Sequence, residues 1–320
     1  MKRNKNVLIV FIIVLLIVVF YLKGTQLFNK YYGYVEETTI PEDEFLVPKL
    51  SNTEISGVVV YSSFNEENVP QIFLKDLETD ETNQLTYSGY NDNPKWSPSG
   101  EKILYLSWTE ENSFDIYTMD KNGNNKIPVV ASPASEKMPD WSPDGEKIVY
   151  VSDEIGKSEI CIIDLITNEV SILKNGTEFV ATPYWSPDGK FLAFISNGGG
   201  PGRSQVFVMD IDGNNKWQVT SYDISNFDGN PVWCPDGSCI LFNRFIEGVP
   251  KIMKYDIKTK ETTLLLENVF SKELIEAQLE RSQIRGLFTF VVGDNFYAMD
   301  LKKMEVYSLE IFALDLSLYP

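Results

Sequence analysis

The side chains that could take part in catalysis or metal binding are mainly acidic, since the chain has 46 Asp and Glu residues and no histidine among 320 residues. The lack of histidine excludes Ser-His-Asp and Cys-His nucleophilic sites and histidine-bearing zinc sites. A glycosidase needs only two suitably separated carboxyl groups, so a carboxylate-based glycan-active enzyme stays open. No pair of acids stands out, however. We therefore predict no catalytic residue, no metal and no cofactor.

Six aspartates recur at the ends of similar apolar runs, and six acids in register could suggest a metal site. They are Asp76, Asp120, Asp164, Asp210, Asp256 and Asp300. Each is followed by residues suited to a hairpin turn. An aspartate that opens such a turn accepts hydrogen bonds from backbone N–H groups two residues on. We therefore interpret all six as structural turn residues.

The elements that position these acids follow from a repeated motif, Pro-x-Trp followed by a tight turn. The four copies are Pro94–Gly100, Pro139–Gly145, Pro183–Gly189 and Pro231–Gly237, and their tryptophans lie 45, 44 and 48 residues apart. After each turn come a short β-branched and aromatic run, a polar loop, a run that ends in aspartate, and a third, weaker run. Four antiparallel strands every 40–50 residues are typical of a β-propeller blade.

Weaker copies of this pattern predict one further blade before the four repeats and one after them. The upstream strands are 57–63, 71–76 and 83–86, with Pro48–Ser51 as the first strand; the downstream strands are 287–292, 295–300 and 305–309, with Ile275–Leu279 as the first strand. A short helix over Lys272–Arg281 competes with that last strand. The predicted fold class is all-β, a six-bladed β-propeller of four-stranded antiparallel blades preceded by one N-terminal transmembrane helix. The alternating run Phe312–Leu318 predicts an extra strand that pairs near the first blade and helps close the ring.

The sequence Trp-Ser-Pro-Asp-Gly followed by an apolar strand resembles the WD-like propeller repeat of the TolB type, whose propeller has six blades. The resemblance covers about residues 46–310 and implies a fold and an extracytoplasmic location. The N-terminal domain of TolB has no counterpart in this sequence, so TolB's envelope role is not implied. Oligogalacturonate-lyase-type propellers have similar repeats but depend on a histidine-bearing metal site, so that activity is not expected. Fold alone does not assign function.

The N-terminus predicts attachment to a membrane. Residues 7–22 are uncharged and almost wholly apolar, three basic residues precede them, and no acid occurs before Glu36. Because no cleavage site follows this run, we predict a retained anchor with the propeller outside the cytoplasm; a cleaved signal peptide is the alternative. The predicted regions are a cytoplasmic basic segment (1–6), a transmembrane signal-anchor (7–22), an acidic linker (23–45) and the propeller (46–320).

Charge and cysteines restrict the partners and the compartment. Four of the 28 basic residues lie at or before residue 23, whereas all 46 acids follow it, so the remainder carries about −22. This charge argues against nucleic acid and anionic lipid as partners and favours solubility, cations or a basic partner. Cys161 lies in an apolar column and is expected in the core. Cys234 and Cys239 flank a Pro-Asp-Gly-Ser turn, where either a disulfide or two free thiols can form.

The repeats are nearly identical at one end of each blade and diverge at the other, where the blade connections lie. The residues predicted to bind a ligand at this divergent end are Tyr90, Asn91, Asp92, Asn93, Glu136, Lys137, Phe227, Asp228 and Asn230. Aromatic rings beside amides and carboxylates suit a carbohydrate or peptide, and loops on rigid scaffolds often carry binding sites. The sequence therefore predicts a membrane-anchored extracytoplasmic propeller. We expect it to act as a non-catalytic binding or scaffold module for a protein partner or an envelope-derived ligand. The alternatives are a glycan-active enzyme and a purely structural surface protein.

Overall fold

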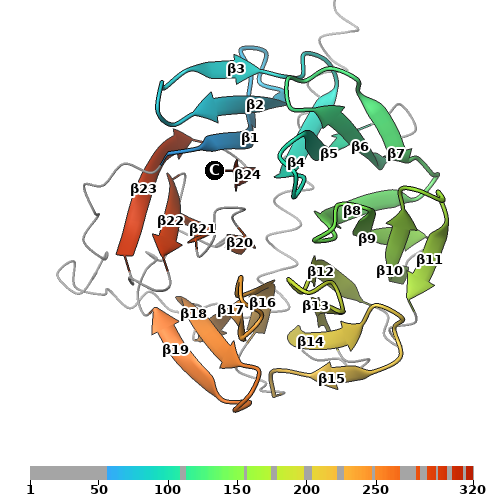
Figure 1. The fold of residues 1–320 in the computed structure, drawn as a ribbon, viewed down its shortest axis with the longest axis vertical. Coiled ribbons are helices and arrows are strands. Elements are labelled where there is room, and N and C mark those ends of the chain that lie inside the picture. Colours follow the sequence, from blue (N-terminus) through green and yellow to red (C-terminus); the bar gives the residue numbers. More distant parts are fainter. Residues whose placement is uncertain are drawn as a thin grey trace, which may run out of the picture. The chain divides into compact units, whose positions relative to one another are not determined.

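The computed structural model describes residues 56–108, 113–154, 157–173, 179–197, 204–221, 227–246, 249–266, 279–281, 287–292, 295–300, 305–312 and 315–319. The chain divides into two units, 1–43 and 44–320, and every described residue belongs to the second. All regular elements among these residues are strands, arranged in four-stranded antiparallel sheets around a common centre (Figure 1).

Five sheets each consist of four consecutive strands. They are β4(Tyr90–Trp96), β5(Lys102–Trp108), β6(Phe114–Asp120) and β7(Ile127–Val130); β8(Ser135–Trp141), β9(Lys147–Glu154), β10(Lys157–Asp164) and β11(Val170–Leu173); β12(Val180–Trp185), β13(Phe191–Ser196), β14(Gln205–Asp210) and β15(Lys216–Gln218); β16(Phe227–Trp233), β17(Cys239–Ile246), β18(Val249–Asp256) and β19(Thr262–Leu266); and β20(Leu279–Arg281), β21(Leu287–Val292), β22(Asn295–Asp300) and β23(Glu305–Phe312).

The remaining sheet is made from both ends of the propeller. Its order is β24-β1-β2-β3, where β1(Val58–Phe64), β2(Pro70–Asp76) and β3(Thr82–Gln84) are joined by β24(Asp315–Tyr319). Strand β24 runs antiparallel to β1, with Tyr61 opposite Leu316. The prediction that the C-terminal run forms an extra strand beside the first blade is therefore confirmed.

The predicted fold class needs correction in two respects. The structure has five blades of four consecutive strands, not six, because the remaining sheet takes its inner strand, β24, from the other end of the propeller. Pro48–Ser51, which was predicted for that inner position, lies outside the described residues. The predicted transmembrane helix, 7–22, also lies outside them. In the described part of the chain there is no helix long and apolar enough to cross a membrane.

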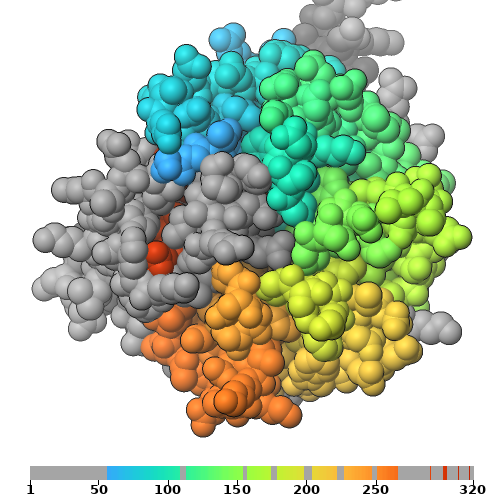
Figure 2. Space-filling model, in the orientation of Figure 1, coloured from blue at the N-terminus to red at the C-terminus, as the bar shows by residue number. Residues whose placement is uncertain are grey.

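The first strand of each consecutive blade lies nearest the centre. Strands β4, β8, β12, β16 and β20 contact one another in that order, and β24 contacts both β20 and β4. The colours in Figure 2 accordingly pass from blue through green and yellow to orange around the face of the molecule. These innermost strands, which we call the inner strands, therefore carry the side chains closest to the axis.

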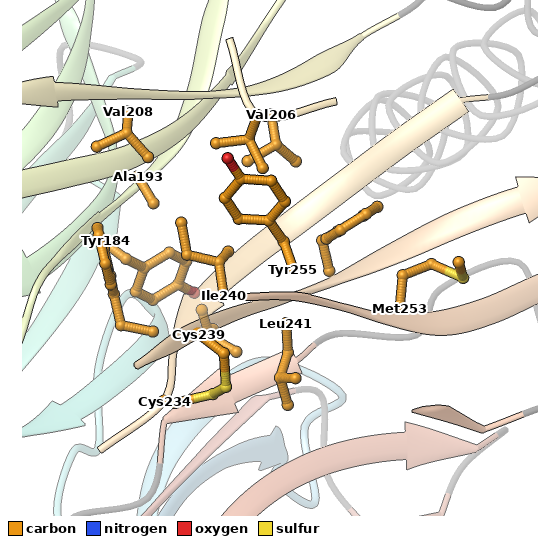
Figure 3. Close-up of a cluster of buried hydrophobic side chains, with 14 of the residues drawn as sticks. Tyr184, Ala193, Val206, Val208, Cys234, Cys239, Ile240, Leu241, Met253 and Tyr255 are labelled. Carbon is orange, nitrogen blue, oxygen red and sulfur yellow. A yellow bond between two sulfur atoms is a disulfide. The ribbon is translucent and has the colours of Figure 1, made fainter. Parts of the chain in front are cut away.

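The repeated tryptophans hold neighbouring blades together. Trp96 packs with Val60 and Ile72 of the preceding sheet, β24-β1-β2-β3, and with Ile103 of its own blade, and Trp141, Trp185 and Trp233 take part in similar clusters. Figure 3 shows the cluster around Trp233, where Tyr184 and Val206 of one blade meet residues of the next. Burying an aromatic ring removes a large apolar area from water, so the motif is structural.

The aspartates that end the third strands make the predicted turn contacts. Asp76 Oδ1 accepts the backbone N–H groups of Glu78 (2.8 Å) and Thr79 (3.0 Å). Equivalent bonds occur at Asp120, Asp164, Asp210 and Asp256. Backbone N–H donors hold the pKa of Asp76 below its usual value, and at Asp164 the Lys147 ammonium is the largest cause of the lowered pKa. The turn that follows Asp300 lies outside the described residues.

Two cysteines of one blade are joined across its first turn. Cys234 and Cys239 form a disulfide with their Cα atoms 5.1 Å apart, visible as the bond between two sulfur atoms in Figure 3. Cys161 is buried in the cluster around Trp141, as expected for a small core residue.

Candidate functional site: the face where the inner strands begin

Strand direction divides the propeller into two faces. The inner strands β4, β8, β12 and β16 each end at a motif tryptophan, and the turn motif follows on the same face as the aspartate hairpins. On the opposite face the inner strands begin, the second strands end and the third strands begin, as shown by the pairing of Tyr90 with Trp108 and of Trp108 with Phe114. This loop face carries the blade connections, where the repeats diverge. All nine predicted site residues lie in the part of the inner strands nearest to it.

The outermost level of the loop face is an aromatic rim. The position six residues before each motif tryptophan holds Tyr90, Ser135, Phe179 and Phe227. Tyr90 is 37% exposed and Phe179 42% exposed, which is high for aromatic rings. Phe227 packs on Phe245 of the adjacent strand, with ring centroids 5.1 Å apart. Three of four equivalent positions therefore present a ring at this face.

Beneath the rim is a level of buried side chains, which we call the polar collar. It consists of Asn91, Glu136, Val180 and Asp228, five residues before the tryptophans, and all four are buried.

The collar residues contact the preceding blade or their own neighbouring strand. Asn91 Nδ2 donates to Gln71 Oε1 (3.1 Å) in the preceding blade. Asp228 receives a two-pronged hydrogen bond from Arg244, at 2.7 Å from Nε and 3.0 Å from Nη2. The Asn91–Gln71 amide pair and the Asp228–Arg244 ion pair thus provide hydrogen bonds to buried polar groups, which would otherwise be costly to remove from water.

Glu136 is the unusual member of the collar. Its side chain is 1% exposed, and Oε1 accepts a hydrogen bond from Ser132 Oγ at 2.7 Å. Oε2 has no hydrogen-bond partner in the part of the chain that the structure describes. Burial raises the pKa of Glu136 to about 7, the Ser132 hydrogen bond opposes this, and the neighbouring Asp115 carboxyl raises it further. Glu136 is therefore in an environment that favours the protonated acid.

The residues that follow the collar on two inner strands, Asp92 and Lys137, are charged, and both have partners at the loop face. Asp92 Oδ1 accepts a hydrogen bond from Ser62 Oγ at 2.6 Å, and burial raises the pKa of Asp92 despite this bond. The Lys137 ammonium pairs with Asp153 on the adjacent strand. Asp153 also accepts a hydrogen bond from Ser158 Oγ at 2.6 Å.

The next residue of each inner strand has an uncommon backbone conformation. Asn93, Met138, Thr182 and Asn230 have φ values of 52°, 52°, 46° and 46°. Each directly precedes the proline of the motif, and the pairing register shifts at each of these points. Asparagine tolerates positive φ, whereas a β-branched residue such as Thr182 is strained there. The inner strands therefore bend at a fixed point below the collar.

The residue between the proline and the tryptophan of each motif is not among the predicted site residues. These residues are Lys95, Asp140, Tyr184 and Val232, and all four are buried. Lys95 Nζ lies 3.2 Å from Tyr184 Oη and 4.4 Å from the centre of the Tyr184 ring. Their strands, β4 and β12, are separated in the ring by β8, so both side chains lie on the axial side of the inner strands. Variation at this one position inside an otherwise constant motif is the signal that could have identified them.

The predicted residues thus form a ring of separate local sites and not a single cluster. Tyr90 and Phe227 belong to the rim, and Asn91, Glu136 and Asp228 to the collar. Asp92, Lys137, Asn93 and Asn230 follow on the same strands. Among the described residues, no group of three or more His, Cys, Asp or Glu side chains could hold a metal ion. The arrangement is suited to contact with a ligand laid over the loop face; that these residues bind one stays a prediction.

A family profile described as the TolB beta propeller domain matches residues 33–273, which is more than half of the chain. The chain belongs to the TolB beta propeller family. No sequence among curated proteins matches it.

Solved structures with similar folds include proteins with and without enzymatic names. TolB from Acinetobacter baumannii has a TM-score of 0.67 at 19% identity, covering 84% of this chain and 68% of that one. An oligogalacturonate lyase in complex with manganese has a TM-score of 0.58 at 17% identity, covering 78% and 73%. A puromycin-hydrolyzing peptidase from Mycobacterium tuberculosis has a TM-score of 0.57 at 16% identity, covering 83% of this chain and 46% of the peptidase. These likenesses show a TolB-like propeller fold, which occurs in TolB and in proteins with enzymatic names.

Proposed function

We propose that this TolB-like propeller is a non-catalytic binding or scaffold module that holds a protein partner at its loop face. The observation that carries the proposal is the aromatic rim, in which Tyr90 and Phe179 stay substantially exposed at equivalent positions of two blades. Exposed aromatic side chains are enriched where proteins bind partners. A rigid ring of sheets also loses little conformational freedom on binding.

Two further observations support a protein as the partner. The chain has a formal net charge of −18, which disfavours nucleic acid and anionic surfaces. A nidogen/laminin complex, which is an assembly of two proteins, is among the structures with a similar fold, with a TM-score of 0.59 at 9% identity, covering 82% of this chain and 98% of that one.

We propose that the propeller lies outside the cytoplasm, at the cell membrane. The disulfide between Cys234 and Cys239 supports an oxidising compartment, because disulfides are rare in the cytosol. The apolar run 7–22 with basic residues before it supports membrane attachment with the propeller on the outer side.

A carboxylate-based glycan-active enzyme is the second candidate, because the Asp115 carboxyl lies close enough to Glu136 to raise the pKa of Glu136. Burial weakens this candidate. Glu136 is 1% exposed and Asp115 6% exposed, whereas a catalytic acid must be within hydrogen-bond reach of the substrate. Of the two functions, binding is therefore favoured.

The test is affinity capture from envelope extract with the detergent-solubilised full-length chain, followed by mass spectrometry. A variant with Tyr90, Phe179 and Phe227 changed to Ser imitates Ser135, which the fold accepts at the equivalent position. We expect this variant to lose the captured protein. Trp217→Ser is the matched control, because Trp217 is 37% exposed, as is Tyr90, but lies on β15, at the outer edge of its blade.

Capture that survives the triple substitution would place the binding surface elsewhere. Glycan turnover that is abolished by Glu136→Gln would make the protein an enzyme and the binding proposal wrong.

A further inference from the structure

One blade carries an aromatic row that continues outward from the rim. Tyr90, Trp108 and Phe114 are paired across three adjacent strands, β4, β5 and β6. The Phe114 ring packs edge-on against both neighbours, 5.5 Å from Tyr90 and 4.8 Å from Trp108. Trp108 is 43% exposed, although the indole is the largest side chain in the row. The row is therefore a preformed aromatic surface at the loop face.

The fold does not require these rings. In the next blade the equivalent residues are Ser135, Asp153 and Ser158, which pair with one another in the same register. Asp153 there binds the Lys137 ammonium. A blade of the same geometry thus forms with three small or polar residues in place of the row, so packing alone does not explain the aromatic side chains.

Acidic groups adjoin the row. Burial and the neighbouring Asp92 carboxyl raise the pKa of Tyr90, in that order, so Asp92 lies near the phenol. Strand β1 meets β4 at this point, through the hydrogen bond from Ser62 Oγ to Asp92 Oδ1 at 2.6 Å. Strand β1 then leads directly into a turn that carries the exposed residues Glu66 and Glu67. The surroundings of the row are therefore negative, as is the chain as a whole.

We propose that the aromatic row binds a lysine- or arginine-rich segment of a polypeptide, with a cationic side chain over the Trp108 ring. Tryptophan is the ring that attracts cations most strongly, and carboxylates around it add charge complementarity. This proposal rests on the proposed binding function and names the chemistry of the partner's contact segment.

The test is a titration of the detergent-solubilised full-length chain with tetra-arginine amide, a tetraglycine amide and a neutral N-acetylglucosamine tetramer, followed by calorimetry. We expect tetra-arginine alone to bind, with an affinity that falls as salt is added. Trp108→Ala should weaken binding about tenfold, while Trp108→Tyr, which keeps a ring, should retain most of it. The Glu66→Gln, Glu67→Gln double variant should also weaken it.

Trp217→Ala, which removes an indole that is 37% exposed, against 43% for Trp108, from the outer edge of another blade, is the control and should leave the affinity unchanged. Equal affinity in the wild type and in Trp108→Ala would overturn the proposal, since binding would then reflect only the general negative charge. Binding of the sugar tetramer that depends on Trp108 would replace it with a carbohydrate site. Partner capture that is lost in the rim variant but kept in Trp108→Ala would refute this inference alone. Partner capture that is kept in both variants would refute the proposed function as well.

Discussion

A carboxyl group inside a protein is stable only where its charge has partners or its proton is retained. Asp228 meets the first condition, because Arg244 donates two hydrogen bonds to it. Glu136, at the equivalent position of another blade, meets the second condition, because burial and then the neighbouring Asp115 carboxyl raise its pKa to about 7. Equivalent positions of the collar are thus stabilised by opposite means.

Glu136→Gln is expected to alter how stability depends on pH. The folded pKa of Glu136, about 7, is above its unfolded value, so between about pH 4.5 and 7 the unfolded state binds fewer protons than the folded state. The wild type therefore loses stability as pH rises through this window, by up to about 3 kcal/mol. Glutamine does not titrate, so the free energy of unfolding of the variant, measured in urea, should rise relative to that of the wild type between pH 5 and pH 8.

Glu159→Gln is the control, because Glu159 is a partly exposed acid of the same blade that pairs with Lys157 at 2.9 Å. It should not reproduce the gain at high pH. A constant difference between Glu136→Gln and the wild type at all pH values would contradict a protonated Glu136.

At the scale of the strand, the bend below the collar concentrates backbone strain at one position. Asparagine occupies it in two inner strands, methionine in one, and threonine in β12. The Thr182 hydroxyl also has no hydrogen-bond partner among the residues described. The fold therefore imposes the conformation at all four positions, and the residue type decides how much strain results.

Thr182→Asn is expected to stabilise the protein by about 1 kcal/mol, because asparagine adopts positive φ with less strain than a β-branched residue. The reciprocal change Asn230→Thr should destabilise by a similar amount. Thermal unfolding should show opposite shifts of about 2–4 °C. Shifts of the same sign in both variants would show that local contacts, not backbone conformation, decide the outcome.

The strands of the repeats and their turns could be predicted because they depend on local chemistry. Pro-x-Trp, the Asp-Gly turns and the terminal aspartates each specify a conformation within a few residues. Which segment fills the inner position beside β1 could not be predicted in this way, because Pro48–Ser51 and β24 are both short candidates and the choice depends on long-range pairing. The burial of Glu136 could not be predicted either, since its sequence neighbours are typical of a loop. Lys95 was not identified as a site residue because it lies within a motif that was interpreted as structural.

At the scale of the whole propeller, the ring is closed by non-covalent pairing between the two ends of the propeller segment. Strand β24 supplies the fourth strand of the composite sheet and contacts the inner strands on both sides, β4 and β20. The Ser317 hydroxyl accepts a hydrogen bond from the Trp96 backbone N–H at 3.3 Å. Without β24, the inner edge of β1 would be unpaired, and an open apolar edge favours aggregation.

Deletion of residues 313–320 from the full-length chain is therefore expected to destabilise the propeller. About five ladder residues are lost, and at about 1 kcal/mol per hydrogen bond the melting temperature should fall by about 10 °C or more. Added synthetic peptide Ala-Leu-Asp-Leu-Ser-Leu-Tyr-Pro should restore part of the loss in a concentration-dependent manner, because it binds only the folded state. A scrambled peptide of the same composition should have no effect, since it cannot match the register of Tyr61 with Leu316. Equal melting temperatures for the deleted and intact chains would mean that the ring is held together without β24.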